Sequence, residues 1–107
     1  MKTGNVIAEI SIVPIGTGST GLSKYVADCI NILGKKKELK YQLTPMGTII
    51  EGPLEKVLET VKLMHEAPFY DGVLRVVTTI KIDDRRDKKA SMESKVASVR
   101  GKLTGQG

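Results

Sequence analysis

Apolar side chains recur at every second position from Asn5 to Ile15, and this period of two predicts a β-strand with one wholly apolar face. Pro14 is expected to mark the end of that strand, because proline has no N–H to donate to a neighbouring strand. Similar runs predict three more strands, and the four are residues 5–15, 39–44, 48–51 and 73–83. The turn Pro45-Met46-Gly47 joins the middle two as an antiparallel hairpin.

Apolar residues at helical spacing predict three helices, with apolar stripes over residues 22–33, 54–64 and 92–103. Pro53 is expected in the first turn of the second helix, where its missing N–H is not needed. Pro68 and Gly72 are expected to end that helix. The third stripe predicts an amphipathic helix at the C-terminal end.

This order of elements predicts an α+β domain of the ferredoxin-like βαββαβ type with an additional C-terminal helix. We expect an antiparallel sheet of four strands, with the first and fourth strands central or near-central and the two main helices on one face. The 107 residues leave room for one domain, which spans residues 1–107.

The opposite face of the predicted sheet is half polar. Val13 and Val77 lie there among polar side chains such as Glu9, Ser11 and Thr79. A chain of this length buries only about 60–70% of its unfolded surface, so its core is thin. A thin core beside a partly apolar open face predicts a homo-oligomer with closed symmetry, with a tetramer favoured and a dimer as the alternative.

Cys29 is the single cysteine, so the chain cannot form an internal disulfide and suits a reducing compartment. No apolar run approaches the ~20 residues that a membrane helix needs. The N-terminal residues lead directly into a strand pattern instead of a signal-peptide segment. We therefore expect a cytoplasmic protein that has no membrane partner.

The net charge of +5 permits nucleic-acid binding without requiring it. Basic residues cluster over residues 35–40 and 85–89, and aspartates compensate the second cluster. The βαββαβ order is also that of the RNA-recognition motif, which stacks bases on aromatic side chains of its central strands. The equivalent positions here carry no aromatic residue. A nucleic-acid-binding module is therefore the disfavoured alternative, limited to salt-sensitive binding without sequence preference.

The segment Gly16-x-Gly18-x-x-Gly21 has the spacing of a dinucleotide-binding fingerprint. That fingerprint belongs to a parallel sheet, whereas the hairpin indicates an antiparallel one, so no nucleotide cofactor is expected. The loop still offers backbone N–H groups and hydroxyls at a helix N-terminus, where a polar or anionic ligand group binds well. A plain glycine turn explains the loop equally well.

No residues have the spacing of a catalytic triad or of a metal site. His65, the one histidine, borders the apolar stripe of the second helix, and Cys29 lies on the stripe of the first. Both are expected to be structural, with an inert thiol. The sequence favours a binding protein without cofactor or metal over an enzyme.

Three longer segments are distinctive. They are Val13-Pro-Ile-Gly-Thr-Gly-Ser-Thr with Leu22-Ser-Lys-Tyr-Val, then Met46-Gly-Thr with Glu51, and then Thr78-Thr-Ile-Lys-Ile-Asp-Asp-Arg-Arg-Asp87. With them the chain resembles the thiamine-binding protein family. The resemblance implies a ferredoxin-like fold, dimers and tetramers formed through the sheets, and binding of thiamine or its hydroxymethylpyrimidine portion. A cytosolic carrier or sensor is the expected role, and an enzyme acting on a thiamine precursor is an alternative.

The candidate binding residues supply hydroxyls, carboxylates and one adaptable apolar side chain. They are Thr17, Ser19, Thr48, Glu51, Glu9, Ser11, Met46 and Asp83. The hydroxyls and Glu51 could read the donor and acceptor edges of an aminopyrimidine. Glu9 and Asp83 could offset the charge of the thiazolium cation.

These candidates come from three segments of the chain. We expect the exits of the first and third strands to share one edge of the sheet, with the exit of the fourth strand elsewhere. One protomer would then not gather all three segments, which favours a pocket completed at a subunit interface. Arg85 and Arg86 are equally well explained by contact with ligand or by structural pairing with Asp84 and Asp87.

Overall fold

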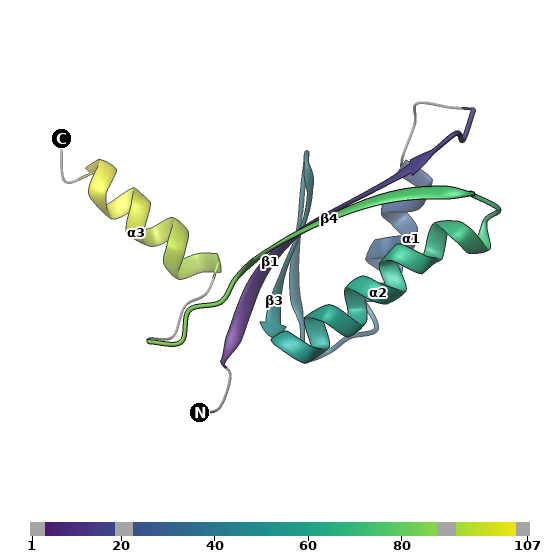
Figure 1. Cartoon of the computed structure of the whole chain (residues 1–107). Helices are drawn as coiled ribbons and strands as arrows, with labels where there is room; N and C mark the ends of the chain where they lie inside the picture. Colours follow the sequence, from purple (N-terminus) through teal and green to yellow (C-terminus); the bar gives the residue numbers. More distant parts are fainter. Residues whose placement is uncertain (1–3, 19–22, 88–91, 105–107) are drawn as a thin grey trace.

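The computed structural model describes residues 4–18, 23–87 and 92–104. Its elements are β1 (Asn5–Ile15), α1 (Ser23–Leu33), β2 (Lys40–Thr44), β3 (Gly47–Pro53), α2 (Leu54–Tyr70), β4 (Arg75–Asp83) and α3 (Met92–Thr104) (Figure 1). The strands form one sheet in the order β2-β3-β1-β4, and every neighbouring pair is antiparallel. The predicted ferredoxin-like α+β architecture is confirmed.

The apolar face of β1 forms the centre of the hydrophobic core. Val6, Ala8 and Ile10 are almost completely buried, as the period of two predicts. Both main helices pack on this face. The core cluster also contains Cys29 and Leu33 from α1, Val57, Val61 and Met64 from α2, and Ile50 from β3.

The prediction that the fourth strand is central or near-central is wrong. β4 pairs only with β1, and β3 is the second central strand. Ile80 and Ile82 lie opposite Ile10 and Ala8 on the helix-covered face, yet each is 37% exposed, because β4 forms the edge of the sheet. An alternating pattern reports which side of a strand is apolar but not whether the strand has one neighbour or two.

Three prolines lie near the ends of the predicted elements. β1 ends at Ile15, directly after Pro14, as predicted; its ladder with β3 ends at Ile10, so this proline interrupts no pairing on that side. Pro53 occupies the N-cap of α2 instead of its first turn. α2 also continues past Pro68, which lies in the last turn, and ends before Gly72, whose φ of 88° closes the helix as predicted.

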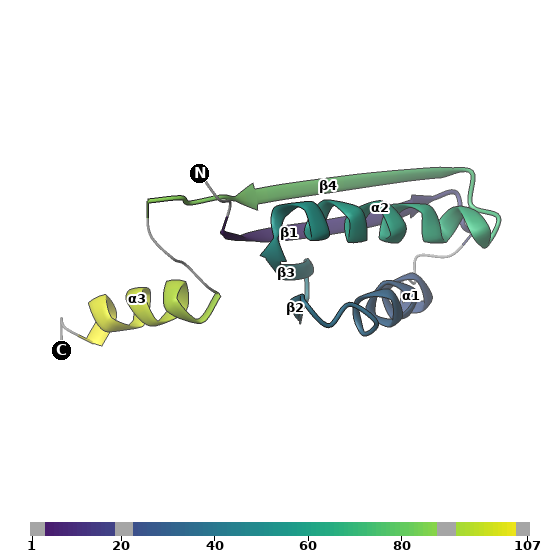
Figure 2. The same cartoon turned by 90° about the horizontal axis from the view of Figure 1, so that it is seen from below.

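α3 stands apart from α1 and α2 in both views (Figures 1 and 2). Its first turn is tied to the sheet by ion pairs, from Lys95 to Asp83 and from Glu93 to Lys40. Its apolar side chains Val96, Val99 and Leu103 are at least half exposed. The predicted amphipathic helix is therefore present, and its apolar stripe has little cover from the described part of the chain. None of the described helices is long and apolar enough to span a membrane.

Gly47, the first residue of β3, is expected to be required for the pairing of the hairpin with β1. A Cβ added at this position would lie 2.6 Å from the carbonyl oxygen of Ile10, closer than backbone atoms allow. The Gly47→Ala variant should lose about 1–3 kcal/mol of unfolding free energy, the usual cost of overpacking. Urea denaturation followed by circular dichroism measures this loss. Gly101→Ala is the matched control, because a Cβ in α3 meets nothing within 4 Å; equal stability of the two variants would contradict the prediction.

Candidate functional site

A cavity of about 600 Å³ lies between α1 and the β2–β3 hairpin, over the helix-covered face of the sheet. α1 packs closely on α2 and less closely on the strands, so it bridges this space without filling it. Ile10 and Ile12 form the floor, Tyr25 and Val26 of α1 form one wall, and Leu43 of the hairpin forms another.

The cavity is mainly apolar, and none of the described residues that line it is charged. Its polar side chains include Thr44 and Thr48. The Thr44 hydroxyl is used within the hairpin, since it donates to the carbonyl oxygen of Gly47 at 2.9 Å and accepts from the backbone N–H of Met46 at 3.3 Å. Concave sites with apolar walls and a few polar groups are typical of small-molecule binding.

Three of the predicted site residues line this cavity: Ser11, Met46 and Thr48. Thr48 is 6% exposed and faces the helices, whereas Met46 is 83% exposed at the tip of the hairpin. Thr17 is half-buried in the segment that follows β1 and does not line the cavity. Ser19 lies outside the described residues.

The predicted carboxylates lie on the other face of the sheet, which the main helices leave open. Ile7 pairs with Glu51 on one side and with Asp83 on the other, so these two carboxylates flank it. Each carboxylate lies near a lysine: Glu51 lies 3.9 Å from Lys40, Glu9 lies 3.9 Å from Lys81, and Asp83 pairs with Lys95. The sheet itself separates them from the cavity of the same protomer.

The expected grouping of strand ends is also wrong. Because β1 is antiparallel to β3 and β4, its exit lies toward the hairpin, while β3 and β4 both end beside the start of β1. The exits of the third and fourth strands, not of the first and third, therefore share one edge. Among the described residues, the cavity is lined by the first two distinctive segments, for example by Val13 and by Met46, and not by the third.

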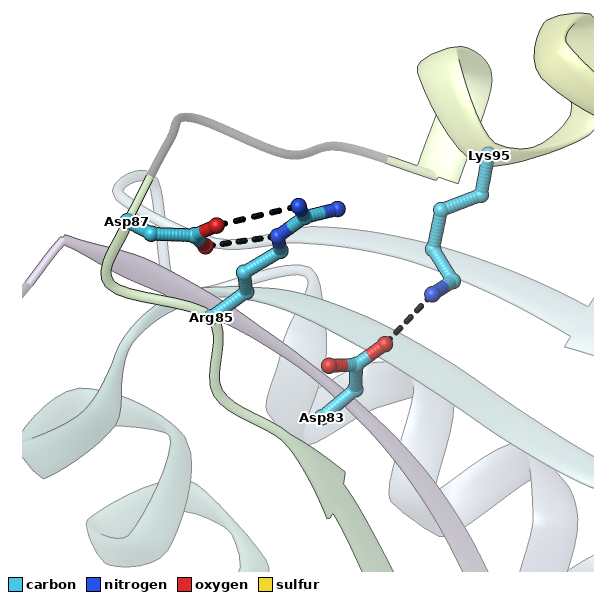
Figure 3. A network of polar contacts seen from close by, with 4 residues as sticks. All are labelled: Asp83, Arg85, Asp87 and Lys95. Carbon is cyan, nitrogen blue, oxygen red and sulfur yellow. Dashed lines mark hydrogen bonds and ion pairs between the residues drawn. The ribbon is translucent and has the colours of Figure 1, made fainter.

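Arg85 and Arg86 are both held in local ion pairs, and Figure 3 shows the pair that Arg85 forms with Asp87. Arg85 donates from Nε and Nη2 to Asp87 at 2.6 and 3.0 Å, and Arg86 donates from Nη2 to Asp84 at 2.8 Å. The hydrogen bond from Arg86 holds the pKa of the Asp84 carboxyl below its ordinary value. This geometry agrees with the structural pairing that the sequence offered as one of two explanations.

His65 and Cys29 both contribute to packing. His65 Nδ1 lies 2.6 Å from the Thr78 hydroxyl, and its ring meets Phe69 edge to face, so it joins α2 to β4. Cys29 is buried and lines the cavity; desolvation, with a smaller contribution from Asp28, raises the pKa of its thiol to about 11. The described residues contain no group of three or more side chains placed to hold a metal ion.

The sequence analysis missed the part that α1 plays in the cavity. Tyr25, Val26 and Ile30 fit a helical stripe, and such a stripe is normally core. One signal was present, since the predicted first strand, residues 5–15, is much longer than either predicted hairpin strand, residues 39–44 and 48–51. The end of so long a strand has no hairpin strand beside it. The helix that follows therefore lies over an incomplete part of the sheet.

Comparisons with known proteins agree on one family. Residues 8–100 match the family model described as "Thiamine-binding protein". The UPF0045 protein YqgV of Bacillus subtilis is 53% identical over 96 residues, which cover 87% of this chain and 92% of that protein. The crystal structure of the hypothetical protein MJ1052 of Methanocaldococcus jannaschii is 41% identical, with a TM-score of 0.81 over 89% of this chain and 95% of that one.

A third similarity supports the fold alone. The chain aligns with a Thermotoga maritima protein provisionally named as a thiamine biosynthesis or salvage protein, with a TM-score of 0.71. The alignment covers 89% of this chain and 98% of that one, but identity is only 23%.

Cys29 is expected to react slowly with alkylating reagents while the protein is folded. A thiol with a pKa of about 11 instead of 9.0 has about 100-fold less thiolate at pH 8, and burial slows it further. The rate of iodoacetamide labelling, followed by mass spectrometry, should rise by at least that factor in denaturing guanidinium. The chain has one cysteine, so the readout is unambiguous. Equal rates in the folded and unfolded protein would contradict the assignment of a buried, protonated thiol.

Proposed function

The chain belongs to the thiamine-binding protein family, and we propose that it binds thiamine, or the hydroxymethylpyrimidine portion of thiamine, in the cavity between α1 and the β2–β3 hairpin. The observation that carries this proposal is the cavity itself. Its volume of about 600 Å³ lies within the range typical of small-molecule sites, roughly 300–1,000 Å³.

The uncharged walls of the cavity support an orientation for the ligand. Burying an unpaired charge in an apolar site is costly, whereas an aromatic ring gains from leaving water. The aminopyrimidine ring therefore enters the cavity, and the permanently charged thiazolium remains at the exposed mouth beside Met46. The methionine side chain can adapt its shape to whatever portion of the ligand emerges there.

A role in binding without catalysis fits the chemistry of the cavity. Within the described part of the chain, the residues that line it include no carboxylate, histidine or lysine that could act as an acid or base. The one strong nucleophile among them, Cys29, is kept protonated by burial. We infer a carrier or sensor in the cytosol as the role that needs only reversible binding.

We also propose that the protein is a homo-oligomer, with a tetramer favoured over a dimer. The support is unpartnered apolar surface in two places: Val77 and Ile15 on the open face of the sheet are 45% and 41% exposed, and the stripe of α3 is at least half exposed. Glu9, Glu51 and Asp83 lie on that open face. They would reach a ligand in the cavity only from a neighbouring protomer, so a pocket completed between subunits stays a prediction.

A side chain that fills the cavity should abolish ligand binding. Val26 lines the cavity and is 37% exposed, so Val26→Trp adds bulk at the mouth without disturbing the core. Calorimetry should detect thiamine and hydroxymethylpyrimidine binding to the parent protein and a loss of at least tenfold in affinity for this variant. Leu63→Trp, at a 44% exposed position of α2 that does not line the cavity, is the control and should bind like the parent.

Two results would overturn the proposed function or its site. If Val26→Trp binds as tightly as the parent, the ligand lies elsewhere. If the parent binds neither compound but binds single-stranded RNA with an affinity that falls steeply between two salt concentrations, the nucleic-acid alternative is correct.

The oligomer is tested by light scattering coupled to size exclusion at micromolar concentration. The parent should have a mass that is a multiple of 11.6 kDa. Val77→Lys, which places a charge on the open face of the sheet, should lower that mass while circular dichroism stays unchanged. Leu74→Lys is the control, because Leu74 is 93% exposed and precedes β4. A monomeric parent protein would contradict the proposal.

A further inference from the structure

We propose that the hydroxyl of Thr48 forms a hydrogen bond with the polar edge of the bound ring, and that this contact makes the cavity prefer a heteroaromatic ring over an apolar ring of the same size. This inference rests on the proposed function and deepens it. It assigns to Thr48 the preference for a heteroaromatic ring over an apolar ring, because apolar side chains cannot distinguish the two by hydrogen bonding.

The position of Thr48 is fixed by the sheet. On β3 it lies opposite Ile10 of β1 and Leu43 of β2, and all three side chains face the helices. Thr48 is 6% exposed and lines the cavity together with those two neighbours and Met64 of α2. A buried polar side chain is thus placed among apolar neighbours of the cavity lining.

The Thr48 hydroxyl has no hydrogen-bond partner within the part of the chain that the structure describes. Other threonines of the fold are paired: Thr60 donates to the Lys56 carbonyl oxygen at 2.7 Å, and Thr78 lies 2.6 Å from His65 Nδ1. No fully buried side-chain oxygen or nitrogen among the described residues lacks a partner, so the Thr48 oxygen is not sealed inside the protein. The open space beside it is the cavity.

An unpaired hydroxyl that lines a cavity favours a ligand that completes its hydrogen bonding. A hydroxyl can both donate and accept, so it suits the amino group or a ring nitrogen of an aminopyrimidine. An apolar ring would fill the same space but leave the hydroxyl without water and without a partner, which costs free energy. Selectivity of this kind requires no charged side chain.

The test compares two ligands on four proteins by calorimetry. The ligands are hydroxymethylpyrimidine and para-methylbenzyl alcohol. The second compound has a ring of the same size with the same methyl and hydroxymethyl groups, but it has neither the ring nitrogens nor the amino group. The proteins are the parent, Thr48→Val, Thr48→Ser and Thr79→Val. Valine keeps the shape of threonine and is favoured in strands, and serine keeps the hydroxyl. Thr79 lies on the open face of the sheet and does not line the cavity, so Thr79→Val is the matched control.

Thr48→Val should weaken hydroxymethylpyrimidine binding roughly three- to tenfold, the effect of losing one neutral hydrogen bond. Binding of para-methylbenzyl alcohol should not weaken, so the preference for the pyrimidine falls by the same factor. Thr48→Ser should keep most of the preference, and Thr79→Val should keep all of it. If Thr48→Val retains the preference of the parent, the inference is overturned while the proposed function stands. If the parent binds no pyrimidine at all, the proposed function itself fails.

Discussion

The central strand β1 is hydrogen-bonded along both edges while its apolar side chains support both main helices, and the remaining elements are positioned by this arrangement. Ile10 lies opposite Thr48 of β3 and opposite Ile80 of β4. This register determines which side chains of β3 and β4 face the helices. The ladder with β3 ends at Ile10, although β1 continues to Ile15. The cavity exists because α1 packs mainly on α2 and lies over the part of β1 that extends beyond its pairing with the hairpin.

The same alternation separates two kinds of chemistry onto two faces of the sheet. Thr48 and Glu51 are three residues apart on β3, an odd spacing, so one side chain faces the helices and the other faces the open side. The Thr48 hydroxyl therefore lines the cavity, whereas the carboxylates lie on the other face of the sheet, each near a lysine, and Glu51 is only 6% exposed there. For a ligand that has a neutral ring and a charged group, this division favours a pose in which the ring lies in the cavity and the charged group lies outside it.

Several charged side chains of this molecule form pairs with nearby charges of opposite sign. Arg85 and Arg86 pair with aspartates within two residues, and Lys36 lies 3.8 Å from Glu59. Exposed pairs of this kind contribute little stability, because water and salt screen them. Two such pairs join α3 to the sheet within the described residues, and the apolar stripe of α3 is at least half exposed there. The net charge of +5 consequently says little about what the protein binds.

The sequence by itself determined the seven elements, the apolar face of β1, the burial of Cys29 and the family, because hydrophobic period and short motifs are local properties of the chain. It did not determine that β4 is an edge strand or that α2 runs through Pro68, since neighbours in space decide both. The sequence also did not locate the cavity, because the cavity depends on the difference in length between β1 and β3 and on the packing of α1 against α2. The odd spacing of Thr48 and Glu51 was visible in the sequence, but only the pairing of β3 with β1 showed which of the two faces the helices.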